Sequence, residues 1–99
     1  MQNFFNSAEN GNISDVKRRL DDGINKDTQN ENGYTALMYA SYHGEIPIVI
    51  SLIEAGCDYS LRNKEGKSAM DYLREEHPDK VKEVQVSRSP TAVVTHSLI

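Results

Sequence analysis

Apolar residues recur at helical spacing in two short segments in the middle of the chain. Residues 35–43 hold the first set, which is Leu37, Met38 and Ala40. Residues 46–55 hold an apolar stripe, formed by Ile46, Val49, Leu52 and Ile53. Gly44 follows the first segment and Gly56 the second, and a glycine just past a helix readily adopts the left-handed conformation that ends it. The pattern predicts two helices separated by a turn.

The same pattern returns at a fixed distance along the chain. All six glycines form pairs with one constant separation, namely Gly11 with Gly44, Gly23 with Gly56, and Gly33 with Gly66. Other positions keep the same register, as in Phe4, Leu37 and Met70, or in Tyr39 and Tyr72. Because most matched positions are apolar, small or glycine, we expect a repeated packing unit of helix, turn, helix and extended turn.

The middle unit begins with Thr35-Ala36-Leu37-Met38-Tyr39-Ala40 and ends with Ala55-Gly56-Cys57-Asp58. These segments and the glycine spacing resemble the ankyrin repeat, whose signature is Thr-Pro-Leu-His-x-Ala. The resemblance covers residues 1–84. It implies an all-α repeat solenoid, in which stacked helix-turn-helix ankyrin repeats are joined by extended β-turn connections. The repeats would span about 1–29, 30–62 and 63–84, with the first and last acting as caps.

Several positions depart from the family pattern. Ala36 and Met38 stand where the family has Pro and His, and Asp71 takes the place of that His in the last repeat. His77-Pro78 replaces the glycine between the last two helices. In the family, the Thr and the His help to tie the helix start to the neighbouring turn. We therefore expect a looser tie in the middle repeat, and we expect departures in a terminal repeat because it faces water on one side.

Composition limits the classes of partner. The net charge is −4, and all fifteen acidic residues lie at or before Glu83, so the repeats are acidic. Binding to a nucleic-acid backbone needs a basic face, which argues against nucleic acid as the main partner. No apolar run is long enough to cross a membrane, and the start of the chain lacks the features of a signal peptide. We expect a monomer in the cytoplasm or the nucleus, without membrane insertion.

Residues that carry chemistry do not form a recognisable active site. The three histidines lie far apart, and the single cysteine, Cys57, falls where the ankyrin repeat usually has a small buried residue. Asp71 and Glu75 share a helix face, but nearby lysines favour a solvated, ion-paired surface over a catalytic carboxylate pair. Every glycine belongs to the repeat, so none is left to form a phosphate-binding loop. We predict no catalytic residues, no metal site and no cofactor.

The resemblance also implies where a partner binds. In ankyrin repeat proteins, partners usually dock on the concave side, which is made by the turn tips and the exposed face of each first helix. The positions of this chain on that side include Glu31, Asn32, Tyr34, Tyr42, His43, Lys64, Glu65, Lys67 and Glu75. Tyr34 and Tyr42 are the strongest candidates, because aromatic residues are enriched at binding hot spots. The alternative is that Tyr34 packs on its own turn and Tyr42 on the next repeat.

These features predict a protein–protein interaction module that recruits or masks a partner of unknown identity. The sequence leaves open whether the module is the N-terminal part of a larger protein. Residues 85–99 lack helical periodicity and predict a flexible tail or linker. Ser97-Leu98-Ile99 resembles the carboxyl-terminal ligand of a PDZ domain, so the alternative prediction is an adaptor whose tail is itself the ligand. We predict that the chain is not an enzyme.

Overall fold

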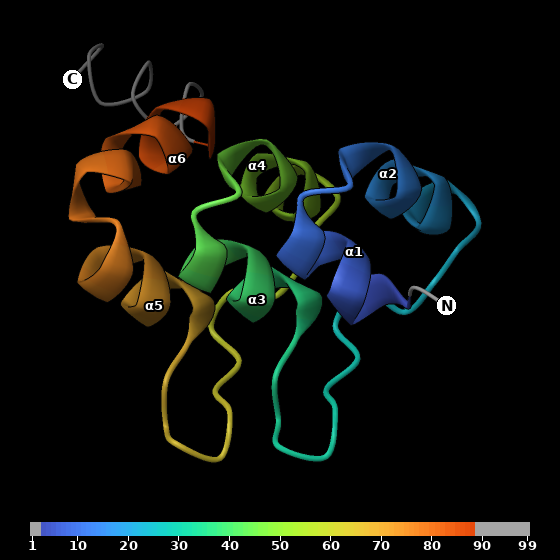
Figure 1. The fold of residues 1–99 in the computed structure, drawn as a ribbon, viewed down its shortest axis with the longest axis horizontal. Coiled ribbons are helices and arrows are strands. Elements are labelled where there is room, and N and C mark those ends of the chain that lie inside the picture. The colour runs from blue at the N-terminus through green and yellow to red at the C-terminus, as the bar shows by residue number, and fades with distance from the viewer. Residues whose placement is uncertain (1–2, 89–99) are drawn as a thin grey trace, which may run out of the picture.

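The structure is a computed structural model that describes residues 3–88. The helices of this part of the chain are α1 (Phe4–Asn10), α2 (Ile13–Asp21), α3 (Ala36–His43), α4 (Ile46–Glu54), α5 (Ala69–Glu76) and α6 (Val81–Arg88), with the short 3₁₀ helix η1 (Pro78–Lys80) between the last two. They follow one another as three pairs that stack side by side (Figure 1). The predicted stack of helix-turn-helix repeats is confirmed.

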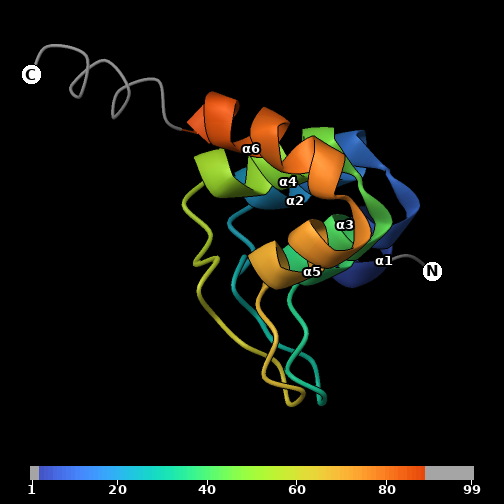
Figure 2. The same ribbon diagram turned by 90° about the vertical axis from the view of Figure 1, so that its left-hand side faces the viewer.

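The helices form two layers. The first helices of the pairs, α1, α3 and α5, lie side by side in one layer, and α2, α4 and α6 form the other (Figures 1 and 2). Helix α3 contacts both α1 and α5, and helix α4 contacts both α2 and α6. The middle pair is therefore covered on two sides, whereas each outer pair is covered on one. Two long connections, one before α3 and one before α5, project side by side from the layers (Figure 2).

Local sequence signals set the limits of helix α3. Thr35 is the N-cap, and its Oγ1 accepts a hydrogen bond from the Met38 N–H at 3.2 Å. Gly44 closes the helix with a φ of 70°, in the left-handed region that favours glycine. A Cβ on Gly44 would lie 2.8 Å from the His77 ring, so the approach of the next repeat also requires a glycine here.

The two projecting connections are held to their helices in the same way. Asn30 and Asn63 occupy matched positions of successive repeats, and each accepts two backbone N–H groups through Oδ1. Each Nδ2 donates to a tyrosine hydroxyl on the following helix at 2.8 Å, from Asn30 to Tyr39 and from Asn63 to Tyr72. One repeated asparagine therefore shapes the turn and fixes it against the helix.

Apolar side chains form a continuous core along the stack. Those with almost no exposed surface include Val16, Leu37, Met38, Ile48, Val49, Leu52, Leu73 and Val84. Ile48 lies off the stripe that the spacing predicts on α4, yet it is only 1% exposed. It is buried because α2 and α6 both cover α4, so more than one face of that helix is removed from water. None of the described helices is long and apolar enough to cross a membrane.

The last repeat ends later than expected. Helix α6 runs from Val81 to Arg88, past the predicted end of the repeats at residue 84. Val84 is buried in the core, and the contact of α6 with α4 explains why the helix belongs to the stack. His77 ends α5 without a left-handed residue, and Pro78 begins η1. The rest of the predicted tail, including Ser97-Leu98-Ile99, lies outside the described residues.

Candidate partner-binding groove

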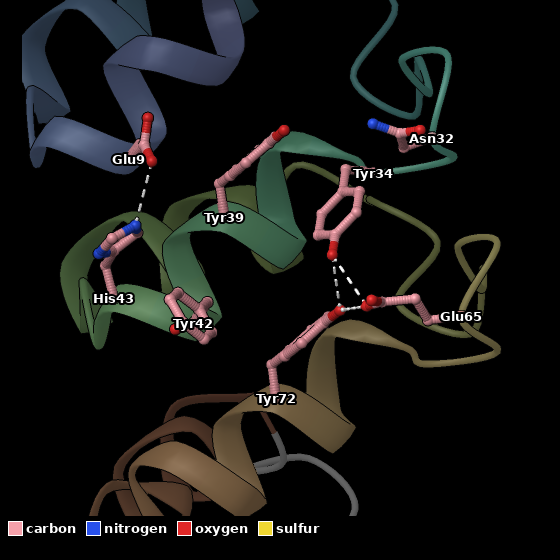
Figure 3. A pocket seen from close by; sticks show the side chains of 8 residues that line it. All are labelled: Glu9, Asn32, Tyr34, Tyr39, Tyr42, His43, Glu65 and Tyr72. Carbon is pink, nitrogen blue, oxygen red and sulfur yellow. Dashed lines mark hydrogen bonds and ion pairs between the residues drawn. The ribbon is translucent and has the colours of Figure 1, made fainter.

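An open groove of about 520 Å³ lies on the side of the first helices and their preceding turns. Its lining residues are Glu9, Asn32, Tyr34, Tyr39, Tyr42, His43, Glu65 and Tyr72 (Figure 3). Glu9 belongs to α1, the middle repeat supplies five of these residues, and the last repeat supplies Glu65 and Tyr72. Because all three repeats contribute, the groove forms only when they are stacked.

Glu65 is the polar centre of one end of the groove. Its Oε1 accepts hydrogen bonds from the Tyr72 hydroxyl at 2.8 Å and from the Tyr34 hydroxyl at 2.9 Å (Figure 3). The Tyr72 hydroxyl, followed by that of Tyr34, lowers the pKa of the Glu65 carboxyl below its ordinary value. The hydrogen bond with Tyr72, followed by burial and the contact with Glu65, raises the pKa of the Tyr34 phenol. At neutral pH this end of the groove therefore carries an ionised carboxylate held by hydroxyl groups.

Aromatic rings line the groove from repeat to repeat. The Tyr34 ring stacks on Tyr39 at a centroid distance of 5.2 Å and on Tyr72 at 6.1 Å. The Tyr42 ring meets Tyr72 edge-on at 5.7 Å, and Phe5 meets Tyr39 edge-on at 5.9 Å. Each such pair contributes about 0.5–1.5 kcal/mol beyond the burial of its surface. The rings therefore hold one another in place and form a preorganised aromatic wall.

The last turn of helix α3 supplies two exposed residues of the groove, Tyr42 and His43. Tyr42 is 47% exposed and meets the His43 ring edge-on at 5.1 Å. His43 Nε2 lies 3.2 Å from Glu9 Oε2 on α1 (Figure 3). On the other side, His77 Nε2 lies 2.9 Å from the Tyr42 carbonyl oxygen. The exposed ring of Tyr42 thus stands on a helix end that both neighbouring repeats hold.

The structure brings five of the nine predicted partner-binding residues together in this groove. They are Asn32, Tyr34, Tyr42, His43 and Glu65. Tyr42 also packs on Tyr72 of the next repeat, as the alternative interpretation proposed. Tyr34 differs from that interpretation, because its ring stacks on Tyr39 of its own repeat and on Tyr72 of the next one. The other four do not line the groove and are Glu31, Lys64, Lys67 and Glu75. Glu31 and Lys64 are exposed in the turns, and Lys67 forms an ion pair with Glu75 at 2.6 Å.

Tyr39 and Tyr72 line the groove although the sequence pattern assigns them to packing. Their match from one repeat to the next is the mark of a repeated packing position. Tyr72 is buried in the core and Tyr39 packs against the rings of Phe5 and Tyr34, but both also contribute to the wall of the groove. One signal was present, because a tyrosine at a repeated core position needs a polar partner and tends to stay near the surface.

The other groups considered for chemistry are held in structural pairs. Asp71 accepts a hydrogen bond from the Ser68 N–H at 3.0 Å and pairs with Arg74 at 2.8 Å. Cys57 is buried, and this burial raises the pKa of its thiol to about 12. Within residues 3–88, no three His, Cys, Asp or Glu side chains lie close enough together to hold a metal ion. What the groove offers a ligand is aromatic surface, hydroxyl groups and carboxylates.

Comparison with known families gives one clear match, to ankyrin repeats in many copies, over residues 20–73. The chain belongs to the ankyrin repeat family. Ankyrin repeats are generally protein–protein interaction modules and are typically not enzymes. The helical stack and its projecting turns agree with this assignment, since repeat solenoids use extended surfaces to bind.

Curated relatives resemble this chain over part of their own length. An ankyrin repeat-containing protein of Schizosaccharomyces pombe is 31% identical over 68 residues, which cover 69% of this chain and 33% of that protein. Ankyrin repeat and SAM domain-containing protein 6 of Mus musculus is 38% identical over 68 residues, covering 68% and 8% respectively. The NAD-capped RNA hydrolase NUDT12 of Homo sapiens is 54% identical over 41 residues, covering 41% and 9%. The chain spans a third or less of the length of these relatives.

Proposed function

We propose that this ankyrin stack recruits or masks a partner protein, and that the partner docks in the groove around Tyr42. The observation that carries this proposal is the 47% exposure of Tyr42 beside an ordered aromatic wall. Large exposed aromatic side chains are enriched among residues that dominate binding energy. Among the described residues, Tyr42 is the large hydrophobic side chain that stands out as exposed.

The rest of the groove supports Tyr42 as an anchor. Its neighbours Tyr34, Tyr72 and Glu65 are held by mutual hydrogen bonds, so binding would order few additional side chains. Association loses about 0.5–1.5 kcal/mol for each flexible side chain that it immobilises, and a preorganised groove avoids much of this loss. Such a groove suits a docking site.

The proposal places this chain among binding modules in the cytoplasm or nucleus, acting without catalysis of its own. Its acidic repeats favour a protein over a nucleic-acid backbone as partner. The alternative, in which Ser97-Leu98-Ile99 binds a PDZ domain, depends on residues outside the described part of the chain. No contact among residues 3–88 favours that alternative.

The proposal can be tested by capture from cell extract on the full chain, followed by quantitative mass spectrometry. Tyr42→Ala should reduce the captured amount of the specific partners by roughly 5- to 150-fold if Tyr42 is an anchor. Tyr42→Phe should retain most binding, because it keeps the ring. Because Tyr42 is 47% exposed and its ring meets Tyr72 edge-on, Tyr42→Ala should lower the thermal midpoint of unfolding modestly, and much less than a core truncation such as Leu37→Ala.

The matched control is Lys17→Ala on α2, in the other layer. Lys17 lines a second hollow of about 330 Å³ between α2 and α4. Capture of the same proteins at the same level by the wild type and by Tyr42→Ala would contradict docking in the groove. Loss of capture with Lys17→Ala alone would move the docking surface to the second hollow.

A further inference from the structure

We propose that the occupant of the groove is a basic protein segment, whose Lys or Arg side chain inserts between the Tyr42 ring and the carboxylates of Glu9 and Glu65. This inference rests on the proposed function and gives the partner its chemistry. It is carried by three features of the groove, which are the sign of its charges, the faces of its rings and the cost of covering its carboxylates.

The residues that line the groove include carboxylates but no Lys or Arg, although Lys67 beside the groove is close enough to help lower the pKa of the Glu65 carboxyl. The two carboxylates among the eight lining residues are Glu9 and Glu65. Glu65 Oε1 accepts two hydroxyl groups, while Oε2 accepts no hydrogen bond from the described residues. Glu9 Oε2 lies 3.2 Å from His43 Nε2, and the Glu9 side chain is 40% exposed. Both carboxylates therefore retain acceptor capacity for a cation from outside.

One tyrosine ring of the groove, that of Tyr72, already lies against an ammonium group of this chain. Lys67 Nζ lies 5.6 Å from the centroid of the Tyr72 ring, and Glu75 holds it in place at 2.6 Å. A cation over a tyrosine ring is attracted by the negative face of the ring, and more strongly when water is excluded. Tyr42 offers a further ring with nearly half of its surface open. The groove therefore offers a second tyrosine ring and two further carboxylates, without a Lys or Arg among the residues that line it.

A partner without positive charge would fit this groove poorly. An apolar segment would remove the Glu9 and Glu65 carboxylates from water without supplying a counter-charge, which is costly. An acidic segment would add like charges at short distance and raise the energy further. A basic segment avoids both effects, and an Arg can stack on a tyrosine ring while its N–H groups pair with a carboxylate. Charge complementarity thus selects the basic occupant.

The first experiment is a selection from a phage-displayed library of random linear peptides on the full chain, with counter-selection on Tyr42→Ala. Peptides that bind the wild type and not the variant should be enriched in Arg and Lys and depleted in Asp and Glu relative to the unselected library. Enrichment of neutral or acidic peptides that still require Tyr42 would overturn the basic occupant and leave the groove as the docking site. Peptides that bind both proteins equally would overturn the docking site itself.

The second experiment measures affinities of one selected peptide by fluorescence anisotropy. Glu9→Gln should weaken binding by roughly 3- to 10-fold, because it removes a charge and nearly preserves the shape of the side chain. Replacing the basic residues of the peptide by citrulline or acetyl-lysine should weaken binding at least as much. Raising the salt concentration should weaken binding of the wild type more than that of Glu9→Gln, since salt screens exposed charge pairs.

The matched control is Glu54→Gln, which removes an exposed carboxylate on α4 outside the groove. This variant should bind the peptide as the wild type does. If Glu54→Gln and Glu9→Gln weaken binding equally, the attraction is to the overall acidic charge of the chain, and the specific placement at the groove is wrong. If neither the salt series nor the citrulline peptide changes the affinity, the basic occupant is also wrong.

Discussion

The middle and last repeats place the same kind of helix in different surroundings. In the layer of first helices, α3 is covered on two sides, by α1 and by α5, whereas α5 is covered on one side, by α3. At the third position of these helices, Met38 is 1% exposed, while Asp71 is partly exposed and pairs with Arg62 and Arg74. The covered helix carries an apolar residue where the outer helix carries a charge. Exposure of the helix flank therefore decides how its N-terminal turn is stabilised.

This difference refines the expectation of a looser middle repeat. Met38 cannot form the side-chain hydrogen bond of the family's His, but its backbone N–H is still capped by Thr35. In the last repeat, Ser68 and Asp71 form a reciprocal capping box, and Arg62 reaches both Asp71 and the Gly66 carbonyl. The middle repeat thus relies on burial and the last repeat on polar contacts. Whether the middle repeat is looser stays a prediction.

The largest expected effect separates a covered from a partly covered core position. Leu37 and Met70 occupy matched positions, but Leu37 is 1% exposed and Met70 is only partly buried. Leu37→Ala should lower the free energy of unfolding by roughly 2–5 kcal/mol through the lost contacts and the cavity. Met70→Ala should cost about half as much, because part of its side chain already contacts water. Urea denaturation followed by circular dichroism measures both, and equal losses would remove the distinction between the two repeats.

A smaller effect is expected at the two N-caps. Thr35→Ala and Ser68→Ala should each lower the free energy of unfolding by about 0.5–2 kcal/mol. The loss should be greater for Thr35, because Met38 is buried and its N–H would be left without an acceptor. Thermal unfolding of both variants gives the comparison, with Ser14→Ala at an exposed position of α2 as control. A greater loss in Ser68→Ala would mean that the polar contacts stabilise the last repeat more than burial stabilises the middle one.

Acid should loosen the last repeat before the middle one. The Ser68 N–H, and after it Arg74, holds the pKa of Asp71 below its ordinary value of 3.8. A carboxyl whose pKa is lowered by folding stabilises the folded protein when the pH is above the ordinary pKa. This contribution is lost as the pH falls through the lower pKa of the folded protein. Amide exchange of α5 should therefore accelerate below about pH 4 relative to that of α3. Asp71→Asn should reduce this pH dependence in α5, and identical acceleration in both helices would contradict the prediction.

The last prediction concerns the junction between the first two repeats, where the difference expected between the two core variants is the smallest. Cys57 of the middle repeat is buried, and its Sγ lies 3.8 Å from the Lys26 carbonyl oxygen at the end of the first repeat. Because the thiol is buried and burial raises its pKa to about 12, its alkylation at pH 8 should be at least roughly 100-fold slower than that of a free cysteine. Iodoacetamide labelling with and without urea measures the difference. Leu37→Ala should accelerate labelling more than Met70→Ala, and equal rates would mean that this junction does not report on the middle repeat.

Much of the fold followed from local signals. Gly44 ends α3 in the left-handed conformation, and Thr35 caps its start, because both depend on residues a few positions apart. The constant spacing of the glycine pairs predicted three units before any contact was known. The end of α6 at Arg88 was missed, because the residues after Val84 show no helical periodicity and helix α6 is held by its contact with α4.

The spacing and turn chemistry of the sequence determined the repeat and the helix pairs, because these signals act within one repeat. Five of the residues that line the groove came from the resemblance to the ankyrin repeat. Only the tertiary structure decided that the Glu65 carboxylate accepts hydrogen bonds from Tyr34 and Tyr72. Tyr34 belongs to the repeat before that of Glu65, and Tyr72 lies on the helix that follows the Glu65 turn. The tertiary structure also decided that Ile48 is buried, because burial depends on which helices cover α4. Patterns along the chain report which residues face the same way, whereas stacking decides which of those faces meet.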